Sequence, residues 1–437
     1  MTTDRYFSRA WMGLLLTAAC GGGGDTSTSG TTGGTGGSGT GSAADTSTGD
    51  EQVTSGPVTS STGDDPETSA SSSSSGGDDG PEPPAAYEKW LKVELEGTVC
   101  GDNSQYKFFV NYKEGAKDLM IMLEPGGACW DYEGCSGTSM DGLGAAHPHG
   151  IPDNLMNDAG ESANISPLIR RDVEGPTQDF NLVYVPYCTG DVHTGNNVIV
   201  YKDPQGVGAD LEFHHAGHTN VLKIADYLRK QFPATDRLFL TGCSAGGAGA
   251  LINYYFFRSK IDAQRGYLMD DSGPLFPSDG YSLPLHTKIR SSWNVDSFFN
   301  ELPPEYPIAE DFGLLNRHLA DIFPKDRLST VFFQRDYNYS RYSYEKFYDA
   351  NTKEDIMTYW ASDTKLLVNL YKTRDNLGYY LPYWRDLNDS HCVSIANYTD
   401  TDIEELDMDL GDFIDELFND DVPIGRYMES VQPDEDD

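Results

Sequence analysis

The sequence has few basic residues, and it has no apolar run long enough to cross a membrane. Its 437 residues include 31 Lys and Arg against 69 Asp and Glu, which gives a formal net charge of -38 at pH 7. A chain this acidic repels phosphate backbones, so we expect no nucleic-acid partner. His214 and His218 have the spacing of one helical turn, but no third metal ligand accompanies them. We therefore expect neither a metal nor another cofactor.

Large apolar side chains are almost absent from residues 21–86, which consist mainly of Gly, Ser, Thr, Asp and Pro. Such a segment cannot bury enough surface to offset its ordering entropy, which predicts a disordered linker. Residues 1–20 carry Arg5 and Arg9, then a short apolar run and small residues up to Cys20, the layout of an export signal. The cysteine predicts a lipoprotein signal with Cys20 lipidated, and a plain secretory signal is the alternative. We expect a secreted or surface-tethered protein, in contact with a membrane only through that lipid.

Residues 87–399 alternate strand and helix patterns, which predicts one large α/β domain. Apolar runs such as "KDLMIMLEPGG" and "DFNLVYVPYC" are typical of buried strands, and "HTNVLKIADYLRKQF" has a helical period. This alternation predicts a mostly parallel central sheet with helices on both faces. Tyr, Trp and Phe concentrate in residues 281–320 and 337–380, where we expect an aromatic-rich cap. From residue 400 to 437 acidic residues dominate, which predicts an acidic C-terminal tail.

The stretch "TGCSAGGAGA" lies between an apolar run and a helical segment. A Gly-x-Ser-x-Gly turn in that context holds its serine, here Ser244, in a strained conformation at a helix N-terminus, where it can act as a nucleophile. Serine needs a base and the base needs an orienting acid, in the chain order Ser, acid, His. Asp336 ends the apolar run "STVFFQRD", and His391 is the one histidine that follows it. Asp271, in "MDDSGP", is the alternative acid or else a residue of the substrate pocket.

Negative charge that develops on the substrate carbonyl requires backbone N–H donors. The amide of Ala245 follows the nucleophile directly, and the glycine loop in "LEPGGACW" supplies the amides of Gly127 and Ala128. Two further stretches near strand ends, "ACW" and "DVHTGN", predict substrate contacts. The candidate side chains there are Trp130, Asp191 and His193.

Six motifs together resemble the pectin acetylesterase/Notum family of α/β-hydrolase carboxylesterases: "LEPGGACW", "PYCTGDVHTG", "GCSAGGAGA", "DDSGP", "QRDYN" and "SHC". The resemblance covers residues 90–395. It implies an α/β-hydrolase fold and a serine esterase with Ser244, Asp336 and His391 as its triad. It also implies the three oxyanion donors above. The family often has an aromatic residue directly after the loop glycines, whereas here Trp130 comes two positions later.

The resemblance implies an acylated substrate, because the family includes enzymes that deacetylate pectin and enzymes that remove a fatty acyl group from a signalling protein. We expect a monomeric, exported serine carboxylesterase, with removal of acetyl from a polysaccharide such as pectin as the favoured reaction. The alternatives are a deacylase or lipase acting on longer acyl esters, and a catalytically inactive binding protein of the same fold.

Beyond Cys20 the sequence contains six cysteines, an even number that predicts up to three disulfides in an exported chain. The family that the motifs resemble is also rich in disulfides. Buried free thiols remain the alternative for the cysteines beside the nucleophile and the histidine. The candidate pairs are Cys129–Cys135, which bracket a short loop, Cys243–Cys392, which flank the predicted triad, and Cys100–Cys188.

Overall fold

The computed structural model describes residues 84–139, 143–156, 166–306, 308–309, 311–350, 352–395 and 397–430. The predicted export signal with Cys20, and nearly all of the predicted linker, lie outside these ranges. Among the helices within them, none combines the length and the apolar character that a bilayer crossing requires.

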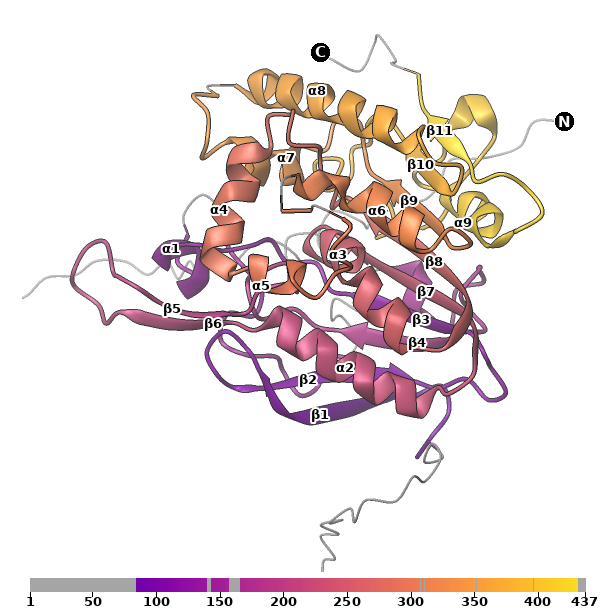
Figure 1. Cartoon of the computed structure of the whole chain (residues 1–437), viewed down its shortest axis with the longest axis horizontal. Coiled ribbons are helices and arrows are strands. Elements are labelled where there is room, and N and C mark those ends of the chain that lie inside the picture. The colour runs from indigo at the N-terminus through magenta and orange to yellow at the C-terminus, as the bar shows by residue number, and fades with distance from the viewer. Residues whose placement is uncertain are drawn as a thin grey trace, which may run out of the picture. The chain divides into compact units, whose positions relative to one another are not determined.

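A central sheet of nine described strands organises the domain, in the order β1-β2-β4-β3-β7-β8-β9-β10-β11 (Figure 1). In this order every neighbouring pair from β4 onward is parallel. At the other edge β1 pairs antiparallel with β2, and β2 pairs antiparallel with β4. This arrangement is an α/β-hydrolase-like fold, as the sequence predicts. The strands are β1 (Trp90–Val99), β2 (Gln105–Asn111), β3 (Leu119–Leu123), β4 (Asn181–Val185), β7 (Thr235–Cys243), β8 (Ala263–Asp271), β9 (Arg327–Val331), β10 (Leu377–Leu381) and β11 (Arg426–Met428).

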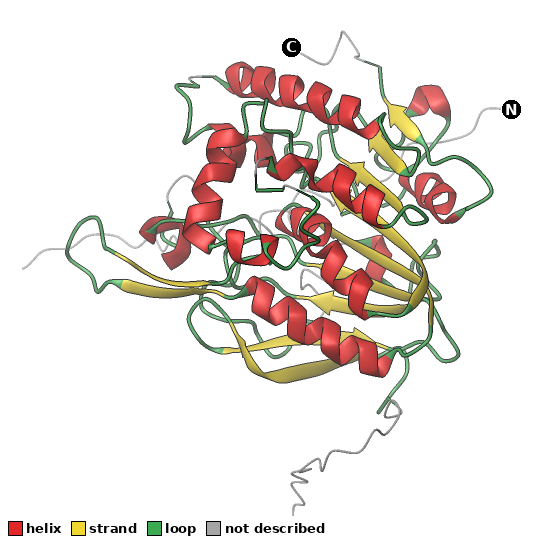
Figure 2. Cartoon of the chain, viewed as in Figure 1, coloured by secondary structure: helices red, strands yellow, loops and turns green. Residues whose placement is uncertain are grey.

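Helices and one hairpin surround this sheet (Figure 2). The antiparallel hairpin of β5 (Asn197–Tyr201) and β6 (Leu211–His215) is separate from the central sheet. The helices are α1 (Tyr132–Ser136), α2 (Gly217–Gln231), α3 (Ala245–Lys260), α4 (Leu283–Trp293), α5 (Asp296–Phe299), α6 (Leu315–Ile322), α7 (Tyr337–Tyr344), α8 (Lys353–Tyr371) and α9 (Leu410–Phe418).

The two faces of the sheet are covered by different helices. A Cβ on Gly242 of β7 would overlap the backbone of Gly246, so Gly242 faces α3. Side chains alternate along a strand, so Phe239 lies on the opposite face. There its ring is 5.1 Å from that of Phe418 in α9. Helices α3 and α9 therefore cover opposite faces, as predicted for a sheet with helices on both sides.

The predicted acidic tail is wrong for its described part, which belongs to the fold. Strand β11 pairs with β10 as the last strand of the sheet. Leu410, Phe413, Ile414 and Leu417 of α9 are buried in the core. These apolar residues recur with a helical period among the acids, and that period outweighs the composition.

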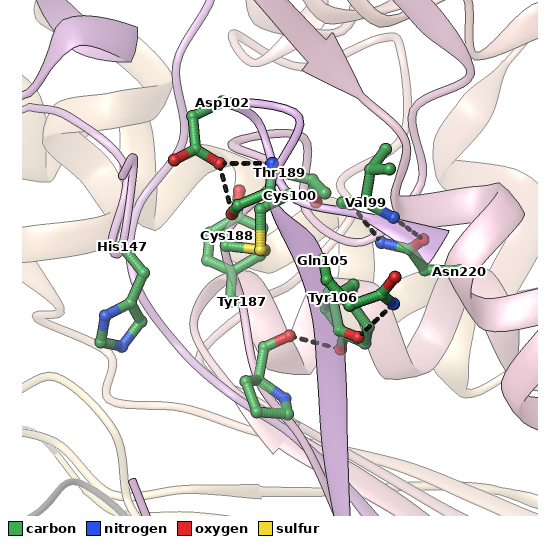
Figure 3. The surroundings of a disulfide bond; sticks show 12 residues. Val99, Cys100, Asp102, Gln105, Tyr106, His147, Tyr187, Cys188, Thr189 and Asn220 are labelled. Atoms are coloured by element: carbon green, nitrogen blue, oxygen red, sulfur yellow. Dashed lines mark hydrogen bonds between the residues drawn. A yellow bond between two sulfur atoms is a disulfide. The ribbon is translucent and has the colours of Figure 1, made fainter. Parts of the chain in front are cut away.

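All three candidate disulfides are present. Cys100, after β1, is bonded to Cys188, after β4 (Figure 3). Beside this bond the amide side chain of Asn220 in α2 exchanges two hydrogen bonds, of 3.1 and 2.9 Å, with the backbone of Val99. The antiparallel edge of the sheet is thus fixed both to α2 and to the loop after β4.

Candidate active site

Ser244 lies in a strained turn between β7 and α3. Its φ is 56° and its ψ is -120°, a combination that side-chain-bearing residues rarely adopt. The turn is possible because a Cβ on Gly246 would overlap the carbonyl oxygen of Leu123, and one on Gly242 would overlap Gly246. The Ser244 amide donates to the carbonyl of Asp271 at 2.8 Å, which fixes the turn to β8. These contacts explain the glycines of the motif.

His391 and Asp336 form a buried pair. Nδ1 of His391 is 2.8 Å from Oδ2 of Asp336. The other carboxylate oxygen of Asp336 accepts the amide of Tyr339 and caps α7 at its N-terminus. Burial alone lowers the pKa of His391, but the charge and hydrogen bond of the Asp336 carboxylate, with a contribution from Asp271, raise it above its ordinary value.

A disulfide joins the chain next to Ser244 to the chain next to His391. Cys243 directly precedes the serine, Cys392 directly follows the histidine, and their Cα atoms are 5.6 Å apart. The two predicted catalytic residues, which are far apart in sequence, therefore emerge from backbone segments that are covalently linked. The disulfide therefore holds the two segments close together, which a serine–histidine pair requires of its backbone.

Asp271 is not a substrate contact, because it is not among the described residues that line the cavity beside Ser244. It is fully buried and its carboxylate accepts from the amides of Val393 and Ser394, both at 2.9 Å, and from the hydroxyls of Ser394 and Ser272. It is also not the partner of His391 Nδ1, because Asp336 holds that position. Asp271 instead fixes the loop that follows His391. Sequence reasoning missed this role.

The predicted oxyanion loop differs from the prediction at one residue. Gly127 and Ala145 form an antiparallel bridge, in which the Ala128 amide donates to the Gly144 carbonyl at 3.1 Å. The Ala128 N–H is therefore engaged and is not the free donor that the sequence predicts. In such a bridge the N–H of the central residue points away from the partner segment, so the Gly127 amide is not used in this bridge. Gly127 and Ala245 both line the cavity beside Ser244.

Asp191 and His193 are buried and are not among the described residues that line the cavity beside Ser244. The Asp191 carboxylate accepts the Thr189 hydroxyl and the amides of Gly195 and Gly217, and burial raises its pKa to about 6. His193 Nε2 is 3.0 Å from the Glu124 carbonyl oxygen, and burial lowers its pKa to about 4. Both substrate-contact predictions are thus wrong in this structure. Their loop contributes Val192 to the lining instead.

The cavity beside Ser244 is mostly apolar. Trp130, predicted as a substrate contact, lines it, and its ring is 6.5 Å from that of Trp293. The indole N–H of Trp293 donates to the Cys129 carbonyl, which fixes α4 against the oxyanion loop. The other lining residues come from the oxyanion loop (Ala128), α3 (Ala248, Ile252), the segment after β8 (Pro274, Leu275, Phe276), α4 and the residue before it (Ser282, Leu285, His286, Ile289) and α7 (Tyr339, Tyr342, Ser343).

A partly buried ion pair supports the histidine loop, and no sequence motif points to it. Arg385 Nη1 lies 3.0 Å from Oε2 of Glu429, a residue of the predicted tail. The backbone N–H and C=O of Arg385 both bond the hydroxyl of Ser390, the residue before His391. Strand β11 has three residues and ends at Met428. Its pattern is too short for the sequence to show that Glu429 lies beside Arg385.

The described residues contain two Cys and His clusters compact enough to hold a metal. In both clusters the two cysteines are bonded to each other as a disulfide. His214 lies in β6 and His218 in α2, so these two histidines do not share one helix despite their spacing. The described residues therefore provide no open set of metal ligands at these positions.

A comparison with known protein families covers the part of the chain that carries Ser244. The Pectinacetylesterase family model matches residues 89–306, which include Ser244 and the oxyanion loop but neither Asp336 nor His391. Pectin acetylesterase 4 of Arabidopsis thaliana is 25% identical over 218 residues, 48% of this chain and 47% of that protein. The palmitoleoyl-protein carboxylesterase notum2 of Xenopus laevis is 28% identical over 156 residues, 36% of this chain and 29% of that protein. The chain thus spans less than half the length of these relatives.

A solved structure of the Wnt deacylase Notum from Drosophila has the same fold. The match has a TM-score of 0.51 at 17% identity, and it covers 79% of this chain and 96% of that one. The structural match extends well beyond the part that the sequence matches cover.

Proposed function

This chain belongs to the pectin acetylesterase/Notum family, and we propose that it is a serine carboxylesterase with Ser244 as nucleophile, His391 as general base and Asp336 as orienting acid. The observation that carries the proposal is the buried His391–Asp336 pair at 2.8 Å, joined through the Cys243–Cys392 disulfide to the strained serine turn. A binding protein with the same fold would have no need for this arrangement. We therefore favour an enzyme over an inactive member.

In the proposed reaction, His391 removes the proton of the Ser244 hydroxyl while the oxygen attacks the ester carbonyl. The amides of Gly127 and Ala245 stabilise the negative charge on the carbonyl oxygen. His391, held by Asp336, then protonates the leaving alcohol oxygen. Water, deprotonated by His391, attacks the acyl-enzyme in the same way and releases the acid.

The cavity beside Ser244 is the proposed acyl site. The histidine must lie next to the leaving oxygen, so the leaving alcohol belongs on the side of His391. His391 is not among the described residues that line the cavity, whereas the proposed oxyanion donors Gly127 and Ala245 are. The lining includes the large apolar side chains of Trp130, Phe276 and Leu285, an apolar surface larger than the methyl group of an acetyl ester needs. This supports an acyl group longer than acetyl, and removal of acetyl from a polysaccharide, which the Pectinacetylesterase match favours, is the second candidate.

We also propose that the protein acts outside the cytoplasm, because its three disulfides need an oxidising compartment to form and persist. A lipid on Cys20 and a monomeric state are part of the same proposal. Mass spectrometry of the mature N-terminus would detect the lipid, and light scattering would give the oligomeric state.

The direct test is hydrolysis of p-nitrophenyl esters from acetyl to long acyl by the full chain with its disulfides intact. Ser244→Ala should lose the activity, whereas Ser291→Ala, on α4 outside the cavity lining, should keep it. An optimum beyond acetyl would support the acyl site described above, and an optimum at acetyl would favour the second candidate. Hydrolysis that survives in Ser244→Ala, or a folded protein with no activity on any ester, would contradict the esterase proposal.

A further inference from the structure

One histidine interrupts the apolar wall of the cavity. His286 lies on α4, between the lining residues Leu285 and Ile289 in the helix, and only 4% of its surface is exposed. Its Nδ1 is buried and has no hydrogen-bond partner among the described residues. Its ring packs edge-on against Phe312, with centroids 5.6 Å apart. A buried polar atom without a partner is costly, and at the wall of a cavity a bound ligand can supply that partner.

Two other buried histidines of the described chain, His193 and His215, have partners within the protein, whereas Nδ1 of His218 and both ring nitrogens of His318 also have none. His193 contacts the Glu124 carbonyl. His215 lies between the Tyr201 hydroxyl and a backbone carbonyl. Among the histidines of the described chain, His286 is the one that lines the cavity beside Ser244.

The ionisation state of His286 limits what it can bind. Burial, together with the nearby charge of Arg290, lowers its pKa to about 4, so the ring is neutral at pH 7. A neutral imidazole has one N–H donor and one acceptor nitrogen. A hydroxyl group also has both functions, whereas a carboxylate only accepts and an ammonium only donates.

We propose that the acyl group of the substrate carries a hydroxyl at its far end and that His286 binds this hydroxyl. This inference rests on the proposed esterase function and adds the chemical class of the acyl group. The aromatic walls formed by Trp130, Trp293 and Phe276 favour an aryl or alkyl body for the same group. His286 is then a specificity-determining residue that recognises the substrate far from the reacting carbonyl.

The test compares matched pairs of p-nitrophenyl esters that differ by one hydroxyl. Suitable pairs are phenylpropanoate with its para-hydroxy derivative, and a medium-chain alkanoate with its terminally hydroxylated derivative. For each pair, kcat/KM of the hydroxylated ester is divided by kcat/KM of the plain ester, in the full-length wild type and in His286→Phe. We expect this ratio to fall about tenfold in His286→Phe for at least one pair, because the variant loses the hydrogen bond to the hydroxyl.

Two further variants complete the experiment. His286→Asn keeps a donor and an acceptor and should recover part of the ratio. His318→Phe removes another buried histidine, which packs against Tyr306 and does not line the cavity, and it should leave the ratio unchanged. Hydrolysis of p-nitrophenyl acetate by each variant reports an intact fold and nucleophile.

The outcomes separate the two proposals. If His286→Phe hydrolyses the acetyl ester like wild type but shows the same ratio for every pair, the hydroxyl inference is wrong and the esterase proposal stands. If the wild type hydrolyses none of these esters, or Ser244→Ala hydrolyses them equally well, the esterase proposal fails and the inference falls with it.

Discussion

The guanidinium of Arg385 contacts both carboxylate oxygens of Glu429, with Nη1–Oε2 and Nη2–Oε1 distances of 3.0 Å. Glu429 is buried and also accepts the amide of Tyr383. The backbone of Arg385 bonds the hydroxyl of Ser390, which directly precedes His391. The last strand of the sheet is thereby coupled to the loop that carries the proposed base.

We predict that Glu429→Ala lowers both stability and kcat. Removing the carboxylate leaves a partly buried guanidinium without its partner, which costs about 3 kcal/mol of unfolding free energy. The loosened histidine loop should lower kcat more than it raises KM. Urea denaturation and steady-state kinetics measure the two effects. The control is Asp420→Ala, which breaks the more exposed pair with Arg265. It should cost less than about 1 kcal/mol of unfolding free energy and leave kcat unchanged. Equal effects of the two variants on stability and kcat would contradict the prediction.

The second prediction concerns the carboxylate of Asp271, which holds the loop on the other side of His391. Asp271→Asn loses acceptor capacity toward the amides of Val393 and Ser394 and places an NH2 group against one of them. We expect kcat to fall about tenfold or more with KM nearly constant. Ser394→Ala removes only the hydroxyl bond and should have a smaller effect. A large rise in KM with kcat unchanged would instead indicate that Asp271 contacts substrate.

The sequence predicted those parts of the site whose chemistry is carried by local motifs. The turn around Ser244 is recognisable because strand, glycines and helix are contiguous, and Asp336 and His391 follow in the order that the fold requires. The engaged amide of Ala128 could not be predicted, because its acceptor Gly144 belongs to a loop without a regular pattern. The role of Asp271 could not be predicted either, because its partners Val393 and Ser394 lie on a loop that is distant in the sequence.

The fold was likewise predictable where its pattern is local, and not where it depends on residues that are distant in the sequence. The parallel strands were recognisable as continuous apolar runs, which buried strands require. The tail prediction for residues 400–430 allows a short helix, but the acidic composition concealed that the apolar residues of this helix are buried in the core: Leu410, Phe413, Ile414 and Leu417. Strand β11 has only three residues, and its place in the sheet depends on pairing with β10.

The third prediction is a pH dependence of the reaction. Only neutral His391 can accept the serine proton, so kcat/KM should rise with pH through the pKa of this histidine. That pKa is raised mainly by the Asp336 carboxylate against the opposing effect of burial. The midpoint of the rising limb of the pH profile should therefore lie above the ordinary histidine pKa of about 6.5. In Asp336→Asn the limb should move to lower pH, and kcat should fall about a thousandfold or more because the imidazole loses its orienting partner. An unmoved limb in that variant would show that another group controls it.

The fourth prediction concerns the backbone amide of Gly127. This glycine has a φ of 70°, and a Cβ there would overlap the Gly144 carbonyl and the Tyr342 hydroxyl, which are hydrogen-bonded at 3.0 Å. Gly127→Ala should displace the loop and misdirect the amide, and losing one oxyanion donor lowers kcat by about a hundredfold to a thousandfold.

Gly115→Ala is the matched control for this variant. Gly115 has a φ of 78°, yet a Cβ there would meet nothing within 4 Å, so only backbone strain is added. It should cost about 1 kcal/mol of stability and leave kcat unchanged. If Gly127→Ala retains kcat while its stability falls as in the control, the Gly127 amide is not an oxyanion donor. The Ala245 amide would then have to act with a donor from elsewhere, most directly the Ala128 N–H after release from Gly144.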